Sequence, residues 1–176
     1  GEDACITGMK RRRLERLLGS GISLLAYHLP LDAHLTVGNN AQMGMQMGWV
    51  VTGQDDLLWL GELRQPTSVD QVIDEIGDTI DSNPLLIYGG DHQVQRLAWC
   101  TGAAQSEIEK AAAHGADLFV SGEISEQTVH LAKELGVHFI AAGHHATERY
   151  GVQALGDLLA GRFNIEHQYI EIDNPV

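Results

Sequence analysis

The residues of this 176-residue chain best suited to chemistry are a histidine and a carboxylate spaced four apart, His144 and Glu148. They follow an apolar run at residues 137–140, which is bounded by Gly136 and Gly143 and is typical of a buried strand. The helical spacing that comes next predicts a strand-to-helix corner. On the first turn of a helix, this spacing places imidazole and carboxylate on one face, as in a pair of metal ligands. In the alternative interpretation, the histidine only caps backbone groups and the glutamate only favours the helix N-terminus.

The same spacing occurs earlier in the chain. His28 and Asp32 follow an apolar run at residues 23–27, which we expect to be a strand. Pro30 disfavours a continuous helix here, so the two side chains are expected to converge through a turn. Two strand-end pairs indicate two related half-structures that meet at one site. Their four ligands could hold one divalent ion, or form part of a two-metal site that clamps attacking and leaving oxygens. If the corners are only structural, no metal binds.

Two further features lie near expected strand ends. Glu123 stands at the tip of a strand predicted over residues 117–123, where it could face the metals or a substrate, or only be solvated. The small-residue loop at residues 101–106 opens a helix, and it could cradle an anion through backbone N–H groups or form a tight turn. The loop lacks the lysine and the spacing of a P-loop.

The elements that must position these residues alternate as strand, helix, strand, helix and strand in the second half of the chain. This order favours an α/β domain with crossover connections. A capping-box pattern at Ser68 predicts a helix over residues 69–80. We expect residues 84–88 to form a strand that pairs in a hairpin with the run at 96–100. The alternating residues 167–172 predict a closing strand.

Composition limits the classes of partner. Hydrophobic residues make up 44% and charged residues 20% of the chain, as in ordinary soluble globular proteins. The net charge of −13 argues against nucleic acid and anionic membranes, although metal ions can still supply positive charge for a phosphate-bearing small molecule. Cys5 and Cys100 cannot build a disulfide framework or a Cys-rich zinc site, so we expect a reduced, intracellular setting.

Several of these stretches resemble the NIF-three-like family, whose members are also called GTP cyclohydrolase type 2 homologs. They are HLPLDAH at residues 28–34 with GNN at 38–40, GEISEQ at 122–127 and GHHATER at 143–149. The resemblance runs over essentially the whole chain. It implies two α/β lobes with mixed sheets, a dinuclear metal site in the cleft between them, and toroidal homohexamers in the cytoplasm.

We expect residues 1–56 to be the remainder of the first lobe. Residues 57–176 would then be a second α/β region, whose C-terminal corner returns to the shared metal site. The family has a His-His-Gly stretch, which supplies further ligands, upstream of the segment that resembles residues 1–8. We therefore expect part of the protein to lie upstream of this sequence.

The resemblance also assigns roles to residues. His28, Asp32, His144 and Glu148 match metal-ligand positions, and Asp32 and Glu148 are the best candidates to contact or bridge both ions. Histidine with carboxylate suits two divalent ions of zinc, iron, manganese or nickel.

The implied function is a metal-dependent hydrolase, similar to a GTP cyclohydrolase, acting on a nucleotide or a phosphorylated small molecule. Glu123 or His145 is the candidate proton shuttle. Only the family name implies GTP, since nothing in the residues selects guanine. The alternative is a non-catalytic metal-binding ring scaffold or a regulatory partner-binding protein.

Overall fold

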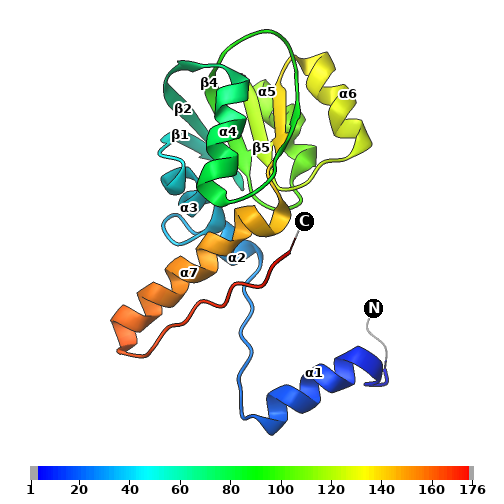
Figure 1. The fold of residues 1–176 in the computed structure, drawn as a ribbon, viewed down its shortest axis with the longest axis vertical. Helices are drawn as coiled ribbons and strands as arrows, with labels where there is room; N and C mark the ends of the chain where they lie inside the picture. The colour runs from blue at the N-terminus through cyan, green and yellow to red at the C-terminus, as the bar shows by residue number, and fades with distance from the viewer. Residues whose placement is uncertain (1–3, 175–176) are drawn as a thin grey trace.

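The structure, a computed structural model, describes residues 4–174 and centres on a six-stranded mixed sheet (Figure 1). The strands are β1 (Val50–Asp55), β2 (Leu58–Thr67), β3 (Leu85–Ile87), β4 (Val94–Cys100), β5 (Leu118–Ser121) and β6 (His138–Ala141). They lie in the order β1-β2-β4-β5-β6-β3. Strands β4, β5 and β6 are parallel, and the other neighbours pair antiparallel. The predicted α/β class with a mixed sheet is confirmed.

Helices cover both faces of this sheet (Figure 1). The helices in the described part of the chain are α1 (Gly8–Gly19), α2 (Leu29–Asp32), α3 (Asn39–Gln46), α4 (Val69–Ile80), η1 (Gln105–Glu107), α5 (Ile108–Ala113), α6 (Glu126–Leu135) and α7 (His144–Phe163). The predicted cap of α4 forms, because the Ser68 side chain accepts a hydrogen bond from the Gln71 backbone N–H. Helices α5 and α6 provide the crossovers that keep β4, β5 and β6 parallel.

Alternate residues of the parallel strands enter two separate cores. Leu97 and Trp99 of β4 belong to the core shared with α3 and α4, whereas Ala98 and Cys100 belong to the core shared with α5 and α6. Trp99 is fully buried between Trp49 and Trp59, with ring centroids 5.0 and 5.9 Å away. Because both faces are covered, residues 97–100 of β4, 118–120 of β5 and 139–141 of β6 are continuous apolar runs in the sequence.

The predicted hairpin between residues 84–88 and 96–100 is wrong. Strand β3 instead pairs antiparallel with β6 at the far edge of the sheet, with Leu85 opposite Ala141. The connecting loop is held there by His138, whose Nδ1 accepts from the Gly89 N–H at 3.2 Å. His138 Nε2 also lies 3.1 Å from the His92 carbonyl oxygen. This anchoring depends on residues far along the chain, so local turn residues could not reveal it.

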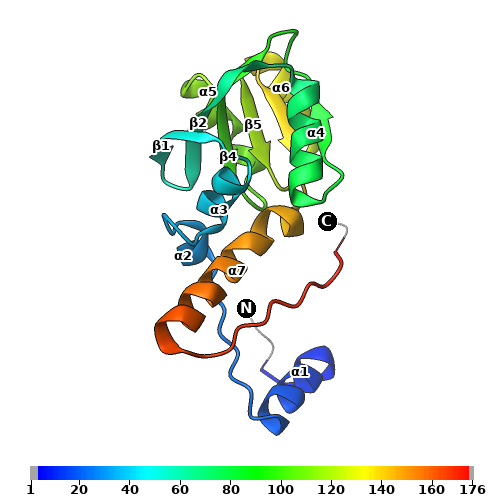
Figure 2. The ribbon, with the colours of Figure 1, turned by 60° about the vertical axis from the view of Figure 1, so that its left-hand side comes forward.

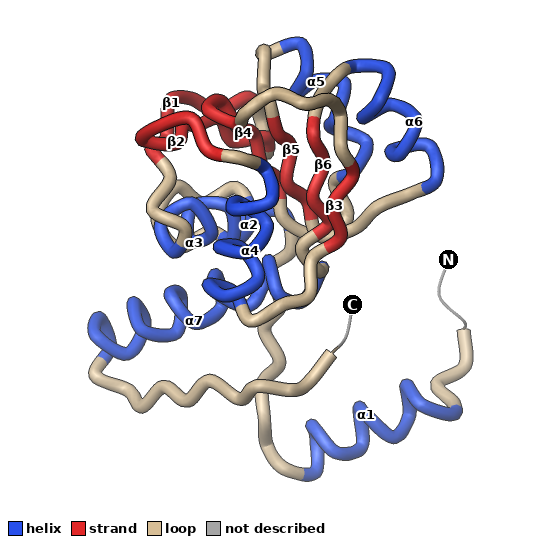
Figure 3. Tube along the Cα trace, turned by 45° about the horizontal axis from the view of Figure 1, so that its top comes forward, coloured by secondary structure: helices blue, strands red, loops and turns tan. Residues whose placement is uncertain are grey.

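The strands predicted at residues 23–27 and 167–172 are also wrong. The structure assigns no strand or helix to residues 22–27 or 165–174, and their apolar side chains are exposed. A strand needs a neighbour for its backbone groups, and an apolar or alternating pattern alone does not provide one. Helix α1 buries none of its residues. It precedes the segment at residues 22–27 and stands apart from the sheet (Figures 2 and 3).

The expected boundary between residues 56 and 57 falls in the turn that joins β1 to β2, and these two strands pair with each other. The division into two lobes, with a metal site in the cleft between them, stays a prediction. Among the described residues, no helix has the length and apolar character needed to cross a membrane.

Candidate metal centre

The carboxyl ends of β4, β5 and β6 lie side by side and form the floor of the candidate site. Gly122 N–H donates to the Gly102 carbonyl at 2.9 Å, and Gly143 N–H donates to the Gly122 carbonyl at 3.0 Å. A Cβ on Gly102, which has φ +69°, would lie 2.2 Å from Glu148 Oε1. The loop after β4 can therefore approach the first turns of α7 only because this residue is glycine. Ligands in α/β sheets collect at this edge, as the sequence predicts.

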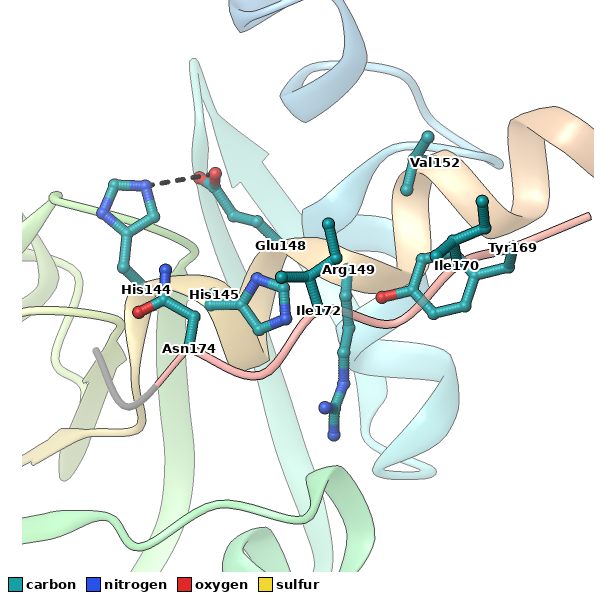
Figure 4. Close-up of a pocket in the computed structure, with 9 residues that line it drawn as sticks. All are labelled: His144, His145, Glu148, Arg149, Val152, Tyr169, Ile170, Ile172 and Asn174. Carbon is teal, nitrogen blue, oxygen red and sulfur yellow. Dashed lines mark ion pairs between the residues drawn. The ribbon is translucent and has the colours of Figure 1, made fainter.

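His144 and Glu148 face each other on the first turns of α7, and Figure 4 shows them pointing toward one another. His144 Nε2 lies 3.2 Å from Glu148 Oε2. On the other side of the ring, His144 Nδ1 lies 2.7 Å from Glu123 Oε1. Burial lowers the pKa of His144, but the hydrogen bond with Glu123 and the charge of Glu148 outweigh burial and hold that pKa above its usual value.

Asp32 is buried at the end of α2 and is held by two consecutive asparagines of α3. Asn39 Nδ2 donates to Asp32 Oδ1 at 2.7 Å, while Asn39 Oδ1 accepts from the Gly151 N–H of α7 at 3.0 Å. Asn40 Nδ2 donates to the Asp32 carbonyl at 3.4 Å, and Asn40 Oδ1 accepts from the Thr101 N–H after β4 at 2.9 Å. These bonds tie Asp32 to both the sheet edge and α7.

Charged side chains of both predicted corners affect the pKa of Glu148. Burial and the negative charge of Asp32 raise the pKa of the Glu148 carboxyl, while the charges of His144 and His28 oppose that rise. A cation beside Glu148 would offset the negative charge of Asp32 that acts on it. His28 itself is exposed just before α2. This helix has a single turn, and Pro30 is its second residue.

His145 and Glu123 take different places. His145 lies next to the others in sequence, but its Nε2 is 2.7 Å from Glu171 Oε1 of the C-terminal segment. Glu123 contacts His144 and so belongs to the corner. Within residues 4–174, no three His, Cys, Asp or Glu side chains form a group arranged to hold a metal ion. The metal and catalytic roles of all six predicted residues stay predictions.

Sequence reasoning missed the residues that support the site. Thr147 is fully buried, and its hydroxyl accepts from the Gly102 N–H at 3.1 Å and donates to the Gly143 carbonyl at 2.9 Å. The consecutive asparagines were the only available signal for the Asp32 support, since buried amides normally have hydrogen-bond partners. Cys100 is buried beside the site, and burial, with the charges of Glu107 and Asp32, raises the pKa of its thiol to about 12. It is therefore a protonated thiol near neutral pH and a poor nucleophile.

Comparisons with known proteins show the family of this chain. The family model described as Duf34/NIF3 (NGG1p interacting factor 3) matches residues 2–175. A relative from Pseudomonas aeruginosa, named GTP cyclohydrolase 1 type 2 homolog, is 51% identical over 181 residues, which cover 99% of this chain and 71% of the relative.

Solved structures share the fold closely. A structural-genomics structure of protein ybgI, of unknown function, has a TM-score of 0.96 at 46% identity. The match covers 100% of this chain and 72% of the ybgI chain. The structure of TTHA1606 from Thermus thermophilus has a TM-score of 0.89 at 37% identity, with coverage of 100% and 72%. The resemblance found in the sequence is confirmed: the chain belongs to the Duf34/NIF3 family.

Proposed function

We propose that this chain binds divalent metal ions and hydrolyses a nucleotide or a phosphorylated small molecule. The observation that carries the proposal is the contact of His144 with both Glu148 and Glu123 at the carboxyl edge of the parallel strands, with the buried Asp32 carboxylate tied to α7 through Asn39. Burying two carboxylates near each other is costly unless a cation offsets their charge. Histidine with carboxylate donors suits zinc, iron, manganese or nickel, and we propose two such ions.

The separation of two side chains at this edge supports a metal. Two ligands that bind one ion at about 2.1 Å lie about 3.0–3.5 Å apart, and His144 Nε2 and Glu148 Oε2 are 3.2 Å apart. The same separation also suits a simple ion pair. The contact on the other side of the His144 ring supports the metal interpretation over the ion pair. Metal-bound histidines usually donate their other ring N–H to a carboxylate, as His144 Nδ1 does to Glu123. We propose His28, Asp32, His144 and Glu148 as the residues that hold the ions.

Bound divalent ions would lower the pKa of water and polarise the electrophile. The chain's own residues would do the rest. Glu123 would fix the tautomer and direction of the His144 ring, and Asn39 would fix the Asp32 carboxylate through the bond at 2.7 Å. His145 lines a cavity beside this edge, and we propose its imidazole as the group that exchanges a proton with the substrate. Glu123 is the other candidate, but its contact with His144 favours a positioning role.

The substrate class and assembly are proposals as well. The names of relatives as GTP cyclohydrolase 1 type 2 homologs support placing GTP in any substrate panel. We further propose a cytoplasmic homohexamer, on the family resemblance.

The experiment is a turnover assay on GTP, other nucleoside triphosphates and simple phosphoesters, before and after chelation. We expect chelation to abolish turnover, and zinc, manganese, iron or nickel to restore it. Glu148→Gln should remove restored turnover, whereas Glu126→Gln, an exposed change on α6, should leave it intact. Metal bound by the wild-type chain without turnover on any substrate would overturn the hydrolase proposal and indicate a scaffold.

A further inference from the structure

The carboxylate of Glu171 is held by three side chains at the edge of the candidate metal centre. Its Oε1 lies 2.7 Å from His145 Nε2. Its Oε2 accepts from the Tyr169 hydroxyl at 2.6 Å and lies 3.8 Å from an Arg149 guanidinium nitrogen. Two of these donors, His145 and Arg149, belong to α7, and Glu171 comes from the extended C-terminal segment at residues 165–174.

The donors follow the proposed metal ligands directly along α7. His145 and Arg149 are four residues apart, as are His144 and Glu148, so each pair occupies one of two adjacent faces of the helix. Members of both pairs line one cavity of about 560 Å³ (Figure 4). A molecule in this cavity can therefore reach the metal face and the cationic face together.

Arg149 is built into the wall of this cavity. Only 14% of its side chain is exposed, and its guanidinium also donates to the Ile80 carbonyl at the end of α4. A largely buried guanidinium on a chain of net charge −13 calls for an anionic partner. Its planar fork recognises carboxylate and phosphate oxygens in the same way.

The Glu171 side chain is held less firmly than the Arg149 side chain. Nearly half of its side chain is exposed, and it lies in a segment that the structure assigns to no strand or helix. The apolar neighbours Ile170 and Ile172 are exposed, so they add little burial to hold the segment down. A free anion with comparable oxygens can compete for the same donors.

We propose that His145 and Arg149 form a phosphate subsite beside the metal centre, and that the Glu171 carboxylate is an internal stand-in which the phosphate group of the substrate displaces. The proposal rests on the proposed function for its substrate class. The subsite itself lies in side chains other than the four proposed metal ligands. Phosphate binding can therefore be measured without metal and without turnover.

The test is calorimetric titration of inorganic phosphate into the metal-free chain and its variants. Glu171→Gln removes the internal competitor, so we expect phosphate to bind about tenfold more tightly than to wild type. Glu166→Gln changes an exposed carboxylate of the same segment and serves as the matched control, with wild-type affinity. If Glu171→Gln binds phosphate no better than Glu166→Gln, the stand-in role is wrong.

The donors are tested in the Glu171→Gln background. Adding Arg149→Gln should weaken phosphate binding by about 10- to 100-fold, because a hydrogen bond to a charged group is lost. Since Arg149 also contacts Ile80, His145→Gln is the second donor variant, and its unfolding curve is recorded beside it. Unchanged phosphate affinity in a folded His145→Gln variant would overturn the subsite. Loss of turnover with phosphate binding intact would instead count against the proposed function alone.

Discussion

The two histidine and carboxylate corners share a spacing but differ in how they are built. His144 and Glu148 follow β6, a buried strand that pairs in parallel with β5 and antiparallel with β3, and the helix that bears them begins at His144. His28 follows an exposed segment without a strand, and Asp32 is buried only because α3 holds it. One corner is therefore set by local structure, and the other by contacts made far along the chain.

Different contacts keep the two corners rigid. The C-terminal corner is fixed by sheet hydrogen bonds and by the close approach of Gly102 to Glu148. The N-terminal corner depends on Asn39, whose amide bonds to Asp32 and to Gly151, which lies 112 residues after Asn39 in the sequence. We expect changes at the C-terminal corner to affect metal binding most, and changes at the N-terminal corner to affect folding as well.

Gly102→Ala should have the largest effect. Its Cβ would overlap Glu148 Oε1, so we expect metal affinity to fall by more than about 100-fold, beyond the usual effect of an outer-shell change. Gly136→Ala is the matched control, because Gly136 has φ +68° with nothing within 4 Å of its Cβ position. Both variants incur backbone strain of about 1–3 kcal/mol, but only Gly102→Ala should lose metal in a competition assay with a chelating dye. Equal metal affinity in the two variants would contradict the packing described here.

Glu123→Gln comes next, since it weakens only the orientation of the His144 ring. We expect a loss of about 10- to 100-fold in metal affinity with little change in the free energy of unfolding. The exposed Glu126→Gln change on α6 is the control. If the two variants bind metal equally well, Glu123 does not support His144.

Asn39→Ala tests what holds the N-terminal corner. It removes the amide that bonds to the buried Asp32 carboxylate and to the Gly151 N–H, so we expect a loss of about 1–3 kcal/mol in the free energy of unfolding in urea. Gln42→Ala removes a hydrogen bond to the Thr36 carbonyl on the exposed side of the same helix, and it should cost less than about 0.5 kcal/mol. Similar losses in both variants would show that Asn39 does not hold the corner.

The smallest expected effect is a pH dependence at His138, which begins β6. Burial lowers the pKa of His138 below its usual 6.5, so the folded protein binds this proton more weakly than the unfolded chain does. The stabilisation is complete above pH 6.5 and is lost as the pH falls below it, by less than about 1 kcal/mol between pH 7 and 6.

The measurement is thermal unfolding between pH 7.5 and 5.5. His138→Gln should show a shallower fall than wild type, whereas His130→Gln on the exposed face of α6 should follow wild type. A wild-type slope in His138→Gln would mean that other groups cause the dependence.

Local patterns predict the elements whose structure is decided locally. The apolar runs of β5 and β6, the Ser68 cap of α4 and the corner before α7 are all found from residues close in sequence. Their success follows from burial on both faces of the sheet, which leaves a continuous apolar signature.

Features set by distant contacts could not be predicted. The pairing of β3 with β6 depends on the hold of His138 on the loop at residues 88–92. The contact of His145 with Glu171 joins residues 26 apart through a segment without regular structure, for which the alternating pattern indicates a strand. Such contacts carry no periodicity, and only the assembled chain reveals them.

The most direct test of the account is the metal content of the purified chain, measured by elemental analysis after loading with zinc or manganese and exhaustive dialysis. We expect about one ion or more per wild-type chain, little metal in His144→Ala, and wild-type content in the exposed control His130→Ala. A folded wild-type chain that retains no metal, or a His144→Ala variant that retains as much as wild type, would contradict a metal centre at this corner.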